Sequence, residues 1–197
     1  MNLDNPFYNI QESDSADIYR QFILGKIIVK QTYNENTNKL EECPLYTILF
    51  NNLNYFKRFY RHLGFVLEFH DEGEFFYITE QLNDLNGANE NAFKVQVILL
   101  LIGEYFSSSG RDLELLCEIN AGLDEHDITM LSSNSKYIEI LRTLNVKGGS
   151  WKEALDYLIK RNFAFRTNVN SIFLSSAGKA FIFHLVQKYA QKNNENM

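Results

Sequence analysis

Apolar residues recur at intervals of three and four positions along much of the chain, which is the pattern of helices with one buried face. In the first half this pattern predicts helices over residues 16–24, 44–50 and 54–63. Pro44 occupies the favoured first-turn position of the second of these helices. The β-branched run at residues 27–29 predicts a short strand between the first two helices.

Alternation of apolar and polar side chains follows the third helix and predicts a β-hairpin. Its strands cover residues 65–69 and 75–78, and the acidic run at residues 71–73 forms the turn. Residues 34–42 are polar and predict a loop before the second helix. The resulting order of helix, strand, helix, helix and hairpin is typical of a winged helix.

A basic helix followed by a hairpin recurs in the second half. The helix covers residues 151–160, and we expect Ser150 and Glu153 to form a capping box at its start. The hairpin has a turn at residues 168–170. Further helices and strands are predicted over residues 91–106, 112–119, 136–144, 163–166, 171–174 and 175–191. We therefore predict an α+β, mainly α fold of tandem winged-helix domains, each a small helical bundle with a β-hairpin wing.

Turn-forming residues divide the chain into segments. Residues 1–15 are polar and predict a flexible N-terminal arm. Asn, Asp and Gly accumulate over residues 81–89, which predicts a domain boundary. We expect a first winged-helix domain at 16–82 and a second at 90–191, the latter with a long linking helix and a closing C-terminal helix.

The composition fits a globular protein that works in the cytoplasm. Hydrophobic residues make up 45% of the chain, with 16 Phe and 11 Tyr as core material. No apolar run approaches the roughly 20 residues of a membrane span, and the N-terminus lacks the pattern of a signal peptide. Cys43 and Cys117 form no Cys-x-x-Cys motif, so we expect two reduced thiols and no membrane association.

Charge is distributed unevenly between the halves. Residues 1–88 hold 7 Lys or Arg and 13 Asp or Glu, whereas residues 89–197 hold 12 of each. Within residues 142–166, six cations face only Glu153 and Asp156. A phosphate backbone would be attracted there, although solvated surface charge explains the pattern equally well. The candidate DNA-backbone contacts in this half are Lys147, Lys152, Lys160, Arg161 and Arg166.

The first half combines a basic helix with an acidic hairpin. Lys57, Arg58 and Arg61 on the helix are further candidate DNA-backbone contacts, but the carboxylates around the hairpin turn would repel DNA. We therefore interpret this half as a protein-binding module. Phe76 and Tyr77 are candidate protein-interaction anchors, and core packing is the alternative role for both.

No catalytic, cofactor-binding or metal-binding signature is present in the sequence. Gly148-Gly149-Ser150 lacks the spacing of a phosphate-binding loop. The histidines are widely separated and lie in no zinc or nucleophile motif; they are His62, His70, His126 and His184. We therefore expect a protein that is not an enzyme and carries no cofactor or metal.

Hydrophobic motifs of the first eighty residues resemble the MukE/MksE accessory subunits of bacterial condensins. They include Leu24-Gly25-Lys26-Ile27-Ile28-Val29 and Phe75-Phe76-Tyr77-Ile78, with related patterns at residues 18–20, 44–50 and 55–65. The short chain and the Asn-rich segment 34–38 are more similar to MksE than to MukE.

The resemblance implies tandem winged helices, usually in a homodimer, that hold an MksF/MukF-like kleisin subunit. Through the kleisin such a protein meets an MksB/MukB-like SMC ATPase and helps to clamp DNA without regard to sequence. It neither hydrolyses ATP nor cuts DNA. The implied setting is the nucleoid, and the implied roles are chromosome condensation and segregation or defence against plasmids.

The alternative from the residues is a stand-alone winged-helix transcription regulator. Such a protein reads base edges with Arg, Lys, Asn or Gln on a recognition helix. The helix at 151–160 offers Lys152, Glu153, Asp156 and Tyr157, and its carboxylates argue against this reading. A hydrolase is a distant third, because no nucleophile is paired with a base.

Overall fold

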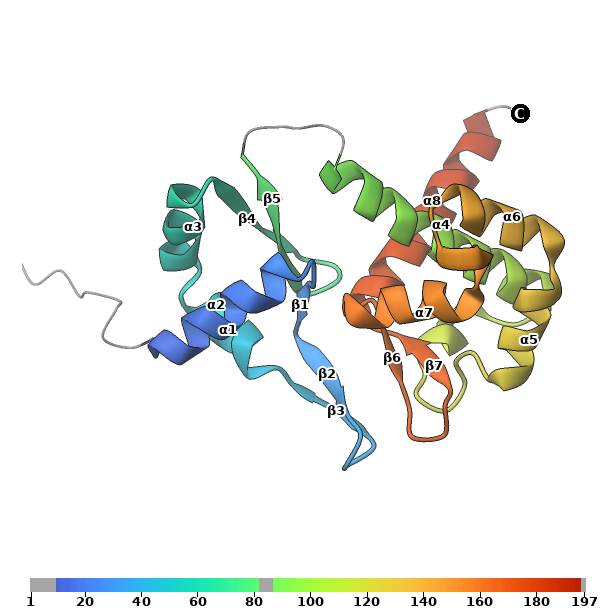
Figure 1. Ribbon diagram of the computed structural model, residues 1–197, viewed down its shortest axis with the longest axis horizontal. Coiled ribbons are helices and arrows are strands. Elements are labelled where there is room, and N and C mark those ends of the chain that lie inside the picture. Colours follow the sequence, from blue (N-terminus) through green and yellow to red (C-terminus); the bar gives the residue numbers. More distant parts are fainter. Residues whose placement is uncertain (1–9, 82–86, 196–197) are drawn as a thin grey trace, which may run out of the picture.

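The computed structural model describes residues 10–81 and 87–195, and the side chains of residues 10–81 and 90–185 (Figure 1). Helices dominate the described chain and three small antiparallel sheets accompany them, which confirms the predicted α+β, mainly α class. None of the described helices is both long and apolar enough to cross a membrane.

The first half contains three helices and five strands in the described residues. Their order is α1 (Glu12–Ile23), β1 (Ile28–Val29), β2 (Gln31–Asn34), β3 (Lys39–Glu42), α2 (Pro44–Asn51), α3 (Leu53–His62), β4 (Phe65–His70) and β5 (Phe75–Glu80). The helix α1 begins four residues earlier than predicted, so part of the expected arm is its first turn, while residues 1–9 lie outside the described residues. The predicted loop at 34–42 is wrong, because β2 and β3 form a hairpin there.

Strand β5 lies between β1 and β4 in a three-stranded sheet of order β1-β5-β4. Its side chains alternate between two buried faces. Phe76 points into a cluster formed with α1, α2 and α3, whereas Phe75 joins the hydrophobic cluster of the second half. In β1, Ile28 belongs to the first cluster and Val29 to the second. The sheet is therefore packed between the helices of its own half and the second half of the chain.

The second half is built around the long helix α4. Its elements are α4 (Gly87–Ser108), η2 (Leu113–Cys117), α5 (Glu125–Ser133), α6 (Ser135–Thr143), η3 (Lys147–Gly149), α7 (Trp151–Lys160), β6 (Ala164–Arg166), β7 (Ile172–Leu174) and α8 (Ser176–Glu195). The segment predicted as a helix at 112–119 is the 3-10 helix η2, and α5 was not predicted. The expected boundary at 81–89 falls partly outside the described residues, and α4 begins within it at Gly87.

The caps of the second half differ from the prediction. Ser150 precedes α7 without a side-chain cap, so the expected capping box at Ser150 and Glu153 is wrong. A capping box is present instead at α5, where Asp124 accepts from the backbone N–H of Asp127 at 2.8 Å. The Asp127 carboxylate accepts in turn from the backbone N–H of Asp124 at 3.2 Å.

The β6–β7 hairpin is extended by one residue from an earlier part of the chain, Leu123, which pairs with β7. Leu123 and Ile172 exchange two backbone hydrogen bonds of 2.7 and 2.8 Å. Gly122 lies so close to this pair that a Cβ atom on it would meet the carbonyl oxygen of Ile172 at 2.1 Å. With Leu123 counted as a strand, the strand order in the second half is Leu123, β7, β6, which matches the order β1, β5, β4 in the first half.

Candidate functional site

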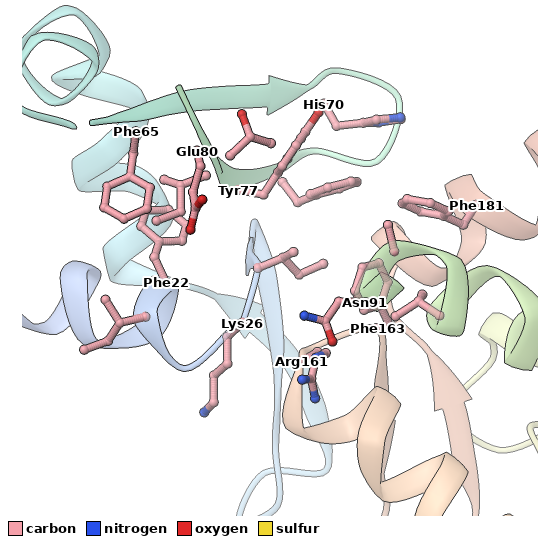
Figure 2. A pocket seen from close by; sticks show the side chains of 18 of the residues that line it. Phe22, Lys26, Phe65, His70, Tyr77, Glu80, Asn91, Arg161, Phe163 and Phe181 are labelled. Atoms are coloured by element: carbon pink, nitrogen blue, oxygen red, sulfur yellow. The ribbon is translucent and has the colours of Figure 1, made fainter. Parts of the chain in front are cut away.

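The two halves of the chain enclose a cleft of about 680 Å³ (Figure 2). On the first half, its wall is formed by the end of α1, the segment between α1 and β1, and the strands β4 and β5. On the second half, α4, α8 and the residues directly after α7 contribute. The main apolar lining residues are Phe22, Ile23, Ile27, Phe65, Phe75, Tyr77, Ile78, Val95, Phe163 and Phe181.

The apolar wall follows from the alternation in β5. Phe75 faces the second half, where its ring lies 6.3 Å from that of Phe181 and 6.5 Å from that of Phe163. Tyr77 is next on the same face, and burial raises its pKa, with a smaller contribution from the Glu68 carboxylate. Because a strand presents alternate residues to one side, these aromatic side chains form a continuous surface.

Arg161 forms the cationic edge of the cleft. Its guanidinium lies 3.6 Å from the centre of the Tyr157 ring, within the range of a cation–π contact. It also lies beside Gly25, at whose position a Cβ atom would be 3.8 Å from the Arg161 Nε and Nη2 atoms. Burial raises the pKa of Tyr157 while Arg161 lowers it, and the Tyr157 hydroxyl donates to Asn91 at 2.7 Å. Arg161 is thus held in place without an ion pair among the described residues.

The remaining charged residues of the cleft are Lys26 and Glu80. Figure 2 shows Lys26 and Arg161 at one edge, with Glu80 toward the hairpin at the opposite edge. Neither Lys26 nor Glu80 has an ion pair in the described part of the chain. His70 accepts from the backbone N–H of Gly73 at 3.1 Å and stacks on Phe75 at 4.7 Å. The cleft is therefore apolar in its middle and oppositely charged at its edges.

Direct hydrogen bonds join the halves beside the cleft. The backbone N–H of Ile27 donates to the Arg161 carbonyl at 3.2 Å, and the Asn162 side chain donates to the Ile27 carbonyl at 2.7 Å. The Ser176 hydroxyl donates to the Gly73 carbonyl at 2.7 Å. These contacts fix the walls relative to one another.

The structure separates the predicted DNA-contact residues. Lys57, Arg58 and Arg61 are exposed on α3, far from α7 in Figure 1. In the second half, Arg166 pairs with Asp156 at 2.7 Å, and Arg161 lies in the cleft. The exposed cations left near α7 are Lys147, Lys152 and Lys160.

The two predicted protein-interaction anchors have different positions. Phe76 is fully buried in the first core, so its role as a surface anchor is wrong: alternation in β5 turns it away from the cleft. Tyr77 is half-buried and lines the cleft. Sequence reasoning missed Phe22, Val95 and Phe163 as site residues. They belong to separate apolar segments, and the sequence gives no sign that these segments come together at one cleft.

The chain was compared with known proteins. A family model described as condensin complex protein MksE matches residues 13–186. No curated protein matches. The matched range extends through both halves, whereas the sequence motifs described above cover mainly the first.

Proposed function

The chain belongs to the MksE family of condensin complex proteins, and we propose that it is a non-catalytic accessory subunit of a bacterial condensin-like SMC complex. In this role it binds an MksF/MukF-like kleisin and, through the kleisin, an MksB/MukB-like SMC ATPase. It acts as a homodimer in the cytoplasm, associated with the nucleoid. The complex serves chromosome condensation and segregation or defence against plasmids.

We further propose that each half is a winged-helix domain, the first at residues 16–82 and the second at 90–191. The observation that carries this proposal is the shared strand order. In both halves the strand from before the helices pairs with the last strand of the hairpin, as β1 pairs with β5 and Leu123 pairs with Ile172 in β7. In both halves a helix, α3 or α7, leads directly into the hairpin.

DNA contact in this proposal is electrostatic and independent of sequence. Exposed cations precede each hairpin: Lys57, Arg58 and Arg61 on α3, and Lys152 and Lys160 on α7. Phosphate contacts of this kind give affinity without base readout. The alternative function, a stand-alone winged-helix transcription regulator, gains no support, since the family match concerns a condensin complex protein.

An affinity purification of the tagged protein from its native cells tests the function. We expect mass spectrometry to identify an SMC ATPase and a kleisin-like chain among the proteins retained at moderate salt. Light scattering on the purified protein then measures whether it is a dimer. Recovery of neither partner at any salt concentration would overturn the proposal.

A further inference from the structure

The β2–β3 hairpin of the first half contacts the β6–β7 hairpin of the second half, and both extend on the same side of the molecule (Figure 1). We propose that this contact is autoinhibitory: the β2–β3 hairpin occupies a phosphate-contact site on the β6–β7 hairpin and is displaced when that site meets DNA. The inference rests on the DNA contact in the proposed function, to which it adds a contact site and its control.

Phe173 in β7 marks the face of the β6–β7 hairpin that the β2–β3 hairpin covers. Its neighbours Ile172 and Leu174 belong to the hydrophobic cluster of the second half. Because side chains alternate along a strand, Phe173 faces the other way, and it lies outside both described clusters although it is 1% exposed. The Tyr33 ring of β2 packs edge-on against it at 5.5 Å, and Phe165 lies beside it at 5.6 Å. Tyr33 thus helps to cover an aromatic face of the second half.

Asn168 identifies the group that the β2–β3 hairpin occupies. It begins the exposed turn at residues 168–170, and its side-chain amide donates to the backbone carbonyl of Glu35 at 2.6 Å. Asn side chains are among the donors that proteins direct at phosphate oxygens. The Glu35 carbonyl therefore takes the place of a phosphate oxygen at this amide. The turn also presents Val169, which is 81% exposed, and contains no cation, so a phosphate contact here uses neutral donors.

The outer part of the β2–β3 hairpin can move while its base stays in place. At the base, the backbone N–H of Lys30 donates to the Glu74 carbonyl at 3.0 Å, and that of Cys43 donates to the Lys30 carbonyl at 2.8 Å. The Lys30 ammonium also pairs with the Glu74 carboxylate at 2.6 Å. None of residues 31–42 is fully buried. Displacement of residues 32–41 therefore breaks few contacts and leaves the core of the first half intact.

Control by the β2–β3 hairpin follows from the populations of its bound and displaced states. A protein whose binding-competent state is only partly populated binds its ligand more weakly, in proportion to that fraction. A change that frees the hairpin should thus raise the affinity for DNA, and a change that fixes it should lower the affinity. Since the turn at residues 168–170 contains no cation, the slope of log affinity against log salt concentration should stay unchanged.

The first test frees the β2–β3 hairpin. Tyr33→Ser removes the ring that packs on Phe173, and Tyr19→Ser on α1 is the matched control, because it removes an exposed tyrosine elsewhere in the same half. Fluorescence anisotropy with a labelled duplex of random sequence measures affinity at several salt concentrations. Hydrogen exchange over residues 31–42 verifies that the hairpin is freed, and circular dichroism verifies that each variant is folded.

The second test fixes the β2–β3 hairpin in place. Glu35→Cys and Asn168→Cys are joined by a short bismaleimide, in a background that carries Cys43→Ser and Cys117→Ser. The control is the same protein before crosslinking, so the loss of the Asn168 amide is common to both samples.

We expect Tyr33→Ser to raise DNA affinity at least about threefold with an unchanged salt slope, and the crosslink to lower it at least about threefold. Tyr19→Ser should stay within about twofold of the wild type. Unchanged affinity after crosslinking would overturn the proposal, and this result decides the question if Tyr33→Ser does not fold. A lower affinity of Tyr33→Ser with faster exchange in the hairpin would also overturn it, since the hairpin would then support the DNA contact.

The DNA contact itself is tested by the same titrations. Absence of DNA binding by the wild type and by every variant would overturn this inference and the proposed DNA contact together. The association with a kleisin and an SMC ATPase is measured separately by the affinity purification, so its failure is distinguishable from a failure of the autoinhibitory contact.

Discussion

The side-chain amide of Asn162 donates a hydrogen bond to the backbone carbonyl of Ile27 at 2.7 Å, between residues 135 positions apart. Asn162 follows α7 with a φ of 66°, in the left-handed region that Asn tolerates better than most residues. One residue before it, the Arg161 carbonyl accepts from the backbone N–H of Ile27. The end of α7 thus satisfies both backbone groups of Ile27 and joins the halves.

Replacing Asn162 should separate its two roles. Asn162→Gly removes the amide but permits the positive φ, so we expect a loss of about 1 kcal/mol in the free energy of unfolding. Asn162→Ala also strains the backbone, which raises the expected loss to about 2–3 kcal/mol. Urea denaturation measures both values. Equal stability of the two variants would show that the backbone conformation contributes little.

The contact between Leu123 and Ile172 predicts a strict requirement for glycine at position 122. A Cβ atom there would lie 2.1 Å from the Ile172 carbonyl oxygen, so Gly122→Ala must displace Leu123 from the hairpin. We expect a loss of about 2–4 kcal/mol, since two buried backbone hydrogen bonds are disturbed together. Thermal unfolding measures the effect, with Ala121→Ser as the neighbouring control. An unchanged melting temperature would argue against the paired geometry.

Strong local patterns made much of the fold predictable. The helix α7 has Trp151, Ala154, Leu155 and Leu158 on one buried face, and its predicted bounds of 151–160 are those of the structure. The β4–β5 and β6–β7 hairpins were predicted from alternation and turn residues. Local periodicity is sufficient to predict an element when its buried residues recur with the period of that element.

Other elements depend on contacts that no local pattern records. The hairpin of β2 and β3 has no fully buried residue, and it contacts the second half through Tyr33, whose ring lies 5.5 Å from that of Phe173. Helix α5 has only Asp127 and Leu131 fully buried, too few to give a helical stripe. The cleft was unpredictable for the same reason, because Phe22 and Phe163 line one cleft only after both halves have folded.

Asp127 predicts a dependence of stability on pH. The Asp127 side chain is buried, and burial by itself would raise its pKa. Hydrogen bonds from Arg111, Tyr105 and the Asp124 backbone outweigh burial, so the pKa of Asp127 is lowered overall. A carboxylate with a lowered pKa in the folded state stabilises the fold above its unfolded pKa of about 3.9. This contribution is lost as the pH falls below about 4 and the folded pKa is reached.

Asp127→Asn should therefore destabilise the protein by about 2–3 kcal/mol near neutral pH, where it leaves Arg111 without its partner. The difference from the wild type should shrink as the pH falls below about 4, because the carboxylate is then protonated in the unfolded chain and, at lower pH, in the folded protein as well. Denaturant titrations at several pH values measure this convergence. As a control, Asp156→Asn removes a more exposed pair with Arg166 and should cost less than about 1 kcal/mol. Parallel pH profiles for wild type and Asp127→Asn would contradict the lowered pKa.

The cations beside the second hairpin predict a salt-dependent contact with DNA. Lys152 and Lys160 are exposed on α7 and have no ion pair among the described residues, whereas Arg166 is neutralised by Asp156. Each phosphate contact contributes about 0.9 to the slope of log affinity against log salt concentration. Lys152→Gln with Lys160→Gln should therefore reduce that slope by up to about 2 for DNA of any sequence. Fluorescence anisotropy at several salt concentrations measures the slope, and Lys39→Gln on β3 serves as the control. A slope unchanged in the double variant would exclude α7 from the DNA contact and leave Lys147 and the basic face of α3 as the remaining candidates.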